Sequence, residues 1–88
     1  MFITGPGDVM QILVKLSTTL RDYVPEYTPS PGIFLPLSDN ETALDVALRL
    51  GLPPLEIKIV MVNGRHAPLD TRLQAGDRVA YFPAVGGG

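Results

Sequence analysis

The sequence predicts an α+β fold in which one main helix packs on one face of a mixed sheet of four to five strands. Three observations favour it. Apolar residues alternate with other residues in segments near both ends, one capped segment has helical spacing, and Asn63-Gly64 is typical of a two-residue hairpin turn. Eighty-eight residues make at most one domain, and an apolar content of 45% is enough for a core.

The first two strands are expected at 11–17 and 33–37. Ile12, Val14 and Leu16 recur at every second position, which is the period of a half-buried strand. A short helical turn and a proline-rich loop follow, and the chain then resumes an extended run. Pro36 lacks an N–H donor, so this second strand should lie at a sheet edge.

The helix is expected between residues that cap its start and residues that end it. Thr42 is a good N-cap, and Asp45 takes the place of the capping-box acid. Gly51 can adopt the left-handed conformation after the last turn, and Pro53-Pro54 prevents continuation. The predicted buried face consists of Leu44, Ala47 and Leu48, widened by Val46 and Leu50.

The last strands are expected at 55–62 and 78–82, with a short return segment after Asn63-Gly64. In the first of them Ile57, Ile59 and Met61 are expected to face the core, and Lys58, Val60 and Val62 the other side. Pro83 should end the final strand. The predicted core comprises Ile12, Val14, Leu16, Leu44, Leu48, Ile57, Ile59, Met61, Val79 and Tyr81.

The first and the last strands are strongly apolar, and neither contains an internal proline. We expect them to lie together in the centre of the sheet, which is a β-grasp arrangement. The predicted organisation is a flexible leader at 1–9, a β-grasp domain at 10–83 and a flexible tail at 84–88.

Composition excludes several classes of site. There is no Cys, so disulfides, thiolate zinc sites and a cysteine nucleophile are excluded, and His66 is the single histidine. We therefore expect no bound metal. The net charge is −2 with scattered Lys and Arg, which argues against nucleic-acid and membrane partners. The beginning of the chain does not look like a signal peptide, so the expected location is the cytoplasm.

The three glycines at 86–88 have two interpretations. They could be a frayed end or a cloning remnant. Alternatively, glycine has no Cβ, so such a tail can pass through a narrow channel and place a terminal carboxylate inside a partner. A carboxylate must be activated before it can act as an acyl donor. The chain has no phosphate-binding loop, so any ATP would have to be bound by the partner.

The segment "DRVAYFPAVGGG", with "VMVNGRHAPLDTRL" before it, resembles the MoaD/ThiS family of sulfur-carrier proteins, which have the ubiquitin-like β-grasp fold. Ala84 replaces a family proline, and Gly86 falls on a variable position. The family's tail motif is matched here by Gly76, Asp77, Val79, Ala80, Tyr81, Phe82, Pro83, Val85, Gly87 and Gly88.

The resemblance implies that the chain is a protein cosubstrate and not an enzyme. A MoeB/ThiF-like adenylyltransferase would use ATP to adenylate Gly88, and a persulfide would convert it into a thiocarboxylate. The acceptor would be the large subunit of molybdopterin synthase in the MoaD branch, which "FPAV" favours. No cofactor would be bound by the chain. The residues expected to enter the partner's channel are Pro83, Ala84, Val85, Gly86 and Gly87.

The open sheet face is the predicted docking surface, because an apolar patch on a monomer usually marks an interface. Leu13, Val60, Val62 and Phe82 are its expected members, although a slip of one residue in register would bury the set. Arg65, Arg72 and Arg78 could pair with an acidic partner, but scattered arginines are more often only solvated.

Other functions remain open. Related carriers serve thiamine thiazole synthesis and cysteine, methionine or tRNA thiolation. A ubiquitin-like modifier would join Gly88 to a target lysine through an isopeptide bond. An interaction module would use the tail for no chemistry at all.

Overall fold

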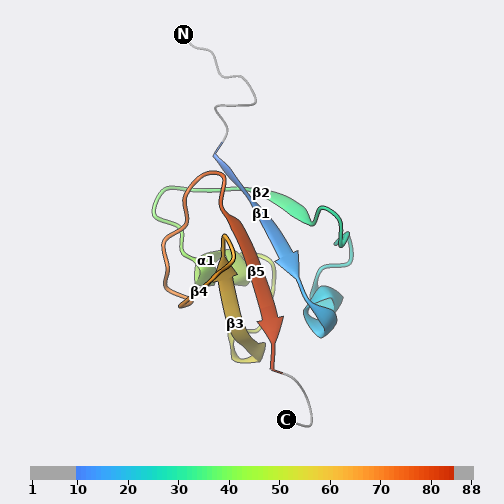
Figure 1. Ribbon diagram of the computed structural model, residues 1–88. Helices are drawn as coiled ribbons and strands as arrows, with labels where there is room; N and C mark the ends of the chain where they lie inside the picture. Colours follow the sequence, from blue (N-terminus) through green and yellow to red (C-terminus); the bar gives the residue numbers. More distant parts are fainter. Residues whose placement is uncertain (1–9, 85–88) are drawn as a thin grey trace.

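A five-stranded sheet with one α-helix packed behind it makes up residues 10–84, the part of the chain that the computed structural model describes (Figure 1). The strands are β1 (Gln11–Leu16), β2 (Ile33–Pro36), β3 (Ile57–Val62), β4 (Arg65–Ala67) and β5 (Arg78–Pro83). The helix is α1 (Ala43–Arg49), and two 3-10 helices are η2 (Thr18–Tyr23) and η3 (Pro54–Glu56).

The sheet order is β2-β1-β5-β3-β4, which confirms the predicted fold class. β1 and β5 are parallel neighbours, and the other pairs are antiparallel, so the sheet is mixed. β5 is the middle strand although it is last in the sequence. β2 is an edge strand, as Pro36 predicted, because proline has no N–H group to donate to a further strand.

α1 begins at the expected capping box. The hydroxyl of Thr42 accepts a hydrogen bond from the Asp45 N–H at 3.1 Å, and the Asp45 carboxylate accepts one from the Thr42 N–H at 3.0 Å. Two N–H groups at the helix start are thereby satisfied. Gly51 has a φ of +80°, which is the left-handed conformation expected after the last turn.

The face that α1 buries differs from the prediction. Ala43, Val46 and Ala47 are fully buried, whereas Leu48 is 55% exposed and Leu44 only partly buried. The Ala43 N–H donates to the Thr71 carbonyl at 3.0 Å, which ties the helix start to the loop before β5. The side of α1 that carries Ala43, Val46 and Ala47 therefore faces the core.

The core lies between α1 and the sheet. It also takes leucines from loops and from η2, which strand and helix periodicity does not identify. Ile59 and Met61 were predicted to belong to the core and are only partly buried on the other face. The buried hydrophobic residues are Ile12, Val14, Leu16, Leu20, Val24, Leu37, Ala43, Val46, Ala47, Leu52, Ile57, Val60, Leu73, Val79 and Tyr81.

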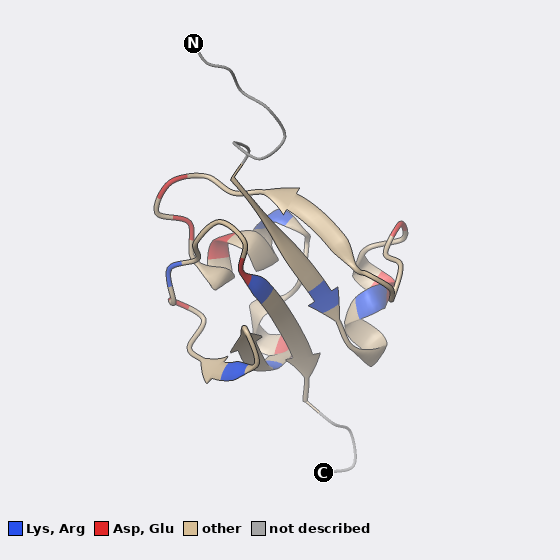
Figure 2. Ribbon diagram, turned by 45° about the horizontal axis from the view of Figure 1, so that its top comes forward, with Lys and Arg blue, Asp and Glu red and all other residues tan. Residues whose placement is uncertain are grey.

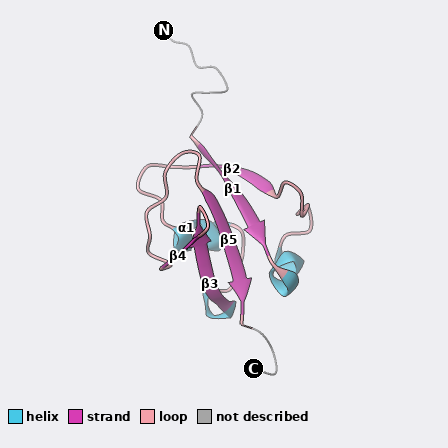
Figure 3. Cartoon of the chain, in the orientation of Figure 1, coloured by secondary structure: helices cyan, strands magenta, loops and turns pink. Residues whose placement is uncertain are grey.

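Loops and turns connect the strands at both ends of the sheet (Figure 3). Asn63 and Gly64 have φ values of +53° and +83°, as a type I′ turn requires, so the predicted hairpin between β3 and β4 is confirmed. Gly32 precedes β2 with a φ of +115°. A Cβ atom at Gly32 would lie 2.5 Å from the carbonyl oxygen of Val14, so glycine allows the loop to pass close to β1.

Candidate protein-docking face

The predicted tail leaves the fold from the middle of the sheet. Pro83 is the last residue of β5 and pairs with Ile57, and Ala84 after it is exposed. The predictions for Val85 and Gly86–Gly88 lie outside the described residues. Any chain that continues beyond Ala84 therefore starts beside β3 and at the end of the most central strand.

Two of the four residues predicted for the docking face lie on the face that α1 leaves uncovered, and the other two do not, because the predicted register of β3 was wrong. Val60 is 4% exposed and pairs with buried Tyr81, and Val62 also packs against the core. The cause is a β-bulge at the start of the strand. Ile57 pairs with Pro83 and Ile59 with Phe82, so Lys58 is an extra residue and the alternation shifts by one after it.

The face that α1 leaves uncovered therefore has a different composition. Leu13 and Phe82 lie on it as predicted, but Ile59 and Met61 take the places expected for Val60 and Val62. Ala80 lies between Met61 and β1. All of these side chains except the small Ala80 are large and apolar, and all are only partly buried. They form the surface that we call the open face.

One signal in the sequence could have located Met61. A two-residue turn at Asn63-Gly64 places Met61 opposite His66 and Val60 opposite Ala67, and this pairing is observed. Opposite a buried residue of the neighbouring strand, an alanine is more favourable than a histidine, because alanine is buried more often. The hairpin register thus indicates which face of β3 is solvated, whereas the all-apolar run from Ile59 to Val62 does not.

A first hollow of about 330 Å³ lies on the open face where β5 ends. Ile59, Phe82 and Pro83 form its apolar part, and Ser17 and Thr18 line it from the segment after β1. The Ser17 N–H donates to the Tyr81 carbonyl at 3.2 Å, which fixes this segment against β5. The hollow is large enough for one apolar side chain, and we call it the tail-side hollow.

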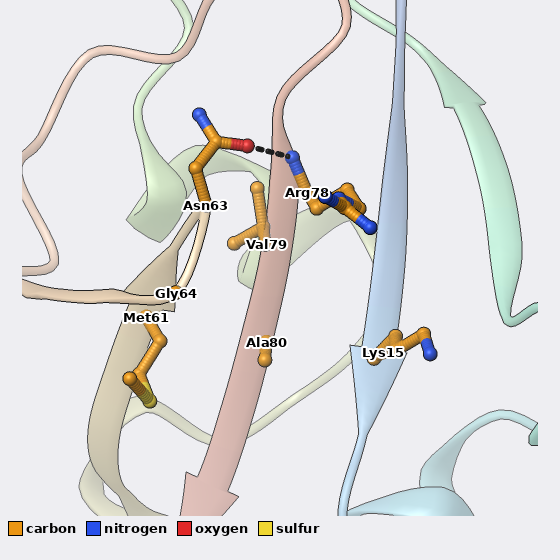
Figure 4. A pocket seen from close by; sticks show the side chains of 7 residues that line it. All are labelled: Lys15, Met61, Asn63, Gly64, Arg78, Val79 and Ala80. Carbon is orange, nitrogen blue, oxygen red and sulfur yellow. Dashed lines mark hydrogen bonds between the residues drawn. The ribbon is translucent and has the colours of Figure 1, made fainter.

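A second hollow of about 350 Å³ lies toward the start of β5 (Figure 4). Met61 borders it on β3, Ala80 and Arg78 on β5, and Lys15 on β1. Figure 4 shows the Arg78 side chain reaching toward β1, the strand that carries Lys15. The two cationic groups thus border one side of the hollow, and we call it the basic hollow.

Asn63 holds the rim of the basic hollow in place. Its side-chain oxygen accepts a hydrogen bond from the Arg78 N–H at 2.9 Å, and its amide nitrogen donates to Asp77 at 2.9 Å (Figure 4 shows the first). The other oxygen of Asp77 accepts from the Gln74 N–H at 2.8 Å. This network links the β3–β4 turn to the start of β5.

Tyr81 anchors β5 from the opposite side of the sheet. Its hydroxyl donates to the Ala43 carbonyl, and burial is the main cause that raises the pKa of this phenol above its ordinary value. The negative charge of Glu41 raises this pKa further, and Arg49 lowers it. The strand that leads to the tail is therefore fastened to the start of α1.

Other candidate sites are weak. His66 is exposed, and the part of the chain from Met10 to Ala84 contains no group of three metal-binding side chains. Within the same part, no helix has the length and apolar character needed to cross a membrane.

The comparisons with known proteins agree with this fold. The HVO 2177 protein of Haloferax volcanii is 28% identical, with a TM-score of 0.69 over 91% of this chain and 88% of that one. SAMP1, the small archaeal modifier protein 1 of the same organism, is 26% identical, with a TM-score of 0.63 over 89% and 99%.

A more distant structure shows the fold alone. A Pyrococcus furiosus protein assigned as molybdopterin converting factor subunit 1 is 19% identical, with a TM-score of 0.64 over 86% of this chain and 99% of that one. No curated protein matches the chain.

The ubiquitin-like β-grasp fold that the resemblance implied is confirmed by these neighbours and by the sheet order. A sequence model described as Mut7-C ubiquitin matches residues 9–86, which include every strand and the helix. The chain is therefore a ubiquitin-like protein and belongs to the Mut7-C ubiquitin family.

Proposed function

We propose that this protein is a sulfur carrier whose terminal glycine, Gly88, is converted into a thiocarboxylate by a partner adenylyltransferase. The observation that carries the proposal is the course of β5. This strand is central in the sheet, ends at Pro83 beside the open face, and leads into the sequence "AVGGG". A partner that binds the open face would therefore have the tail within reach.

The reach of the tail fits this role. Five residues follow Pro83, and an extended chain covers about 3.3–3.6 Å per residue, so Gly88 would lie up to roughly 18 Å from the sheet. Ordering each tail residue costs about 1–2 kcal/mol of backbone entropy. A glycine tail should therefore enter a channel reversibly, as a carrier that serves successive partners requires.

The proposed chemistry has three steps. A carboxylate oxygen of Gly88 attacks the α-phosphate of ATP, which releases pyrophosphate and gives an acyl adenylate. The terminal sulfur of a persulfide then attacks the carbonyl carbon and releases AMP, which gives an acyl disulfide. A thiol of the donor protein cleaves the S–S bond, forming a disulfide itself and leaving the thiocarboxylate on Gly88. The chain contributes no catalytic side chain to these steps.

The acceptor that we propose is the large subunit of a molybdopterin synthase. The support is the tail "FPAVGGG", which resembles the MoaD branch of the carrier family more than the ThiS branch. Sulfur carriers for thiamine thiazole synthesis or for cysteine, methionine or tRNA thiolation are the alternatives. A transfer assay with each acceptor enzyme distinguishes them.

A protein modifier is the second candidate function. It is favoured by the likeness to SAMP1, which is a modifier by name. In that case an amine of a target protein, and not a sulfur nucleophile, would attack the activated Gly88. Activation by an adenylyltransferase is common to both functions.

The test is the intact mass of the protein after incubation with the adenylyltransferase of its own genome, ATP and a persulfide donor. The expected result is a mass increase equal to the difference between one sulfur and one oxygen atom. A variant that lacks Gly88 and a reaction without ATP should show no increase. The mass of the protein isolated from its own host also checks that the mature chain ends at Gly88.

Two results would count against the carrier. Conjugates in cells that join Gly88 to lysine, with no sulfur gained in vitro, would favour the modifier. No reaction of either kind, with a normal phenotype after deletion of Gly88, would leave an interaction module without tail chemistry.

A further inference from the structure

Charge is distributed unevenly between the sheet and the rest of the fold. None of the five strands contains an Asp or Glu, and the acidic residues among 10–84 lie in loops, turns and helices (Figure 2). Lys15 and Arg78, by contrast, lie on the adjacent central strands β1 and β5. The open face is therefore apolar and basic, although the chain as a whole has a net charge of −2.

Lys15 and Arg78 are on the same face of the sheet and close in register. Lys15 pairs with Ala80, and Arg78 pairs with Leu13, so the two residues lie two positions apart along neighbouring strands and both project away from α1. Both are exposed at the edge of the basic hollow.

Neither cation has an acidic partner within the described residues. The ion pair found in residues 10–84 is Arg49 with Glu41, on the side of the molecule that carries α1. Asp77 adjoins Arg78 in the sequence, but its two carboxylate oxygens accept hydrogen bonds from Asn63 and Gln74. The charge of the basic hollow is thus not neutralised by any acidic group of residues 10–84.

The two hollows follow each other along β5. Ala80 lines the basic hollow, and Phe82, two residues further on, lines the tail-side hollow. Residues two apart on a strand point to the same side and lie about 6.5–7 Å apart. Lys15 pairs with Ala80, and Arg78 lies four residues before Phe82, so an occupant that fills both hollows needs a negatively charged group and an apolar group about 6.5–13 Å apart.

We propose that the basic hollow binds a carboxylate side chain of the adenylyltransferase, while a neighbouring apolar side chain of that enzyme fills the tail-side hollow. The inference rests on the proposed function and adds to it the chemistry of the partner's docking segment. Lys15 and Arg78 recognise the carboxylate, and Ile59 and Phe82 contact the apolar group. The segment lies along β5, so the tail is directed toward the enzyme's nucleotide site.

The charge pattern favours an acidic protein segment over a nucleic acid. Binding to nucleic acid depends on many phosphate contacts, which a basic stripe provides. The open face offers two cations among large apolar side chains, and the surrounding loops are acidic. Complementary charges at a protein interface also increase the rate of association and select the partner.

The experiment measures the dissociation constant between the full-length chain and the purified adenylyltransferase of its genome by calorimetry at low and high salt. The test variant is Lys15→Glu with Arg78→Glu. The matched control is Arg65→Glu with Arg72→Glu, which makes the same change in net charge at exposed positions that line neither hollow. A 1H–15N spectrum of each variant checks that it is folded.

The expected result is that the test variant binds at least about tenfold more weakly than the wild type, while the control stays within about twofold. The salt dependence of binding should also decrease in the test variant only, because salt screens exposed charge pairs. Neutralisation by Lys15→Ala with Arg78→Ala should give a smaller loss in the same direction.

Two outcomes would overturn the inference, and they are distinguishable. If the test variant binds like the wild type while the wild-type chain still gains sulfur, the docking inference is wrong and the carrier function stands. If the wild-type chain neither binds the enzyme nor gains sulfur, the proposed function fails and this inference fails with it.

Discussion

The hydroxyl of Tyr81 donates a hydrogen bond of 2.6 Å to the backbone carbonyl of Ala43. Tyr81 belongs to β5 and Ala43 is the first residue of α1, so one buried contact joins the central strand to the start of the helix. The tyrosine is fully buried, with no exposed surface. The strand from which the tail departs is thereby fixed in the fold.

The first prediction is that Tyr81→Phe destabilises the protein. The change removes the donor and leaves the ring in place, and the loss of a buried hydrogen bond costs about 1–3 kcal/mol. Chemical denaturation should show a lower free energy of unfolding. Tyr23→Phe is the control, because the Tyr23 hydroxyl bonds to Glu56 at an exposed position, and it should cost less. Equal losses in the two variants would contradict the importance of the buried contact.

The second prediction concerns high pH. Burial raises the pKa of Tyr81 in the folded state, whereas the unfolded chain has the ordinary value of 10.0. Above that value the unfolded state loses a proton that the folded state keeps, so the free energy of unfolding falls as the pH rises. Below it both states are protonated and Tyr81 adds no pH dependence.

Denaturation at a series of pH values from 9 upward checks this prediction. The Tyr81→Phe variant should lose stability less steeply with pH than the wild type. Some slope should remain in it, because the hydrogen bond to Glu56 raises the pKa of Tyr23 in the same direction. A slope that Tyr81→Phe leaves unchanged would rule out Tyr81 as its source.

The third prediction compares the effect of an aspartate on the stability of the protein at each of the two faces of β3. Val60→Asp places an unpaired charge in the core, which costs about 3–5 kcal/mol and should abolish the folded spectrum. Ile59→Asp changes the open face and should cost about 1–2 kcal/mol, so that the variant stays folded. The measurement is a 1H–15N spectrum with a thermal melt. If Ile59→Asp unfolds the protein and Val60→Asp does not, the observed register is wrong.

The fourth prediction is that Gly32→Ala is more harmful than Gly51→Ala. Both glycines have positive φ, but a Cβ atom at Gly32 would meet the Val14 carbonyl oxygen, whereas the space around Gly51 is open. Backbone strain alone costs about 1–2 kcal/mol at Gly51. The clash adds to the strain at Gly32, so we expect about 3 kcal/mol or more there. Thermal melts of the two variants give the order, and equal values would contradict the close approach to β1.

Local signals in the sequence determined most of the elements. Thr42 and Asp45 satisfy two N–H groups at the helix start by themselves. Pro36 has no N–H group to donate to a neighbouring strand inside a sheet. Asn63 and Gly64 both tolerate a positive φ. Each of these properties belongs to a residue or to its near neighbours, so each was predictable. The central position of the first and last strands also followed, because both are apolar and neither has an internal proline, whereas the places of β3 and β4 were not predicted.

The face that β3 presents was decided only by the tertiary structure. Ile59 to Val62 are all apolar, so alternation along the strand does not say which of them is buried. The bulge at Lys58 forms because Ile57 and Ile59 pair with consecutive residues of β5, which are far away in the sequence. The pairing of β1 with β5, which are also far apart in the sequence, brings Lys15 beside Arg78. The sequence by itself thus determined the fold class and the tail motif, whereas the pairing of distant strands decided which side chains form the open face.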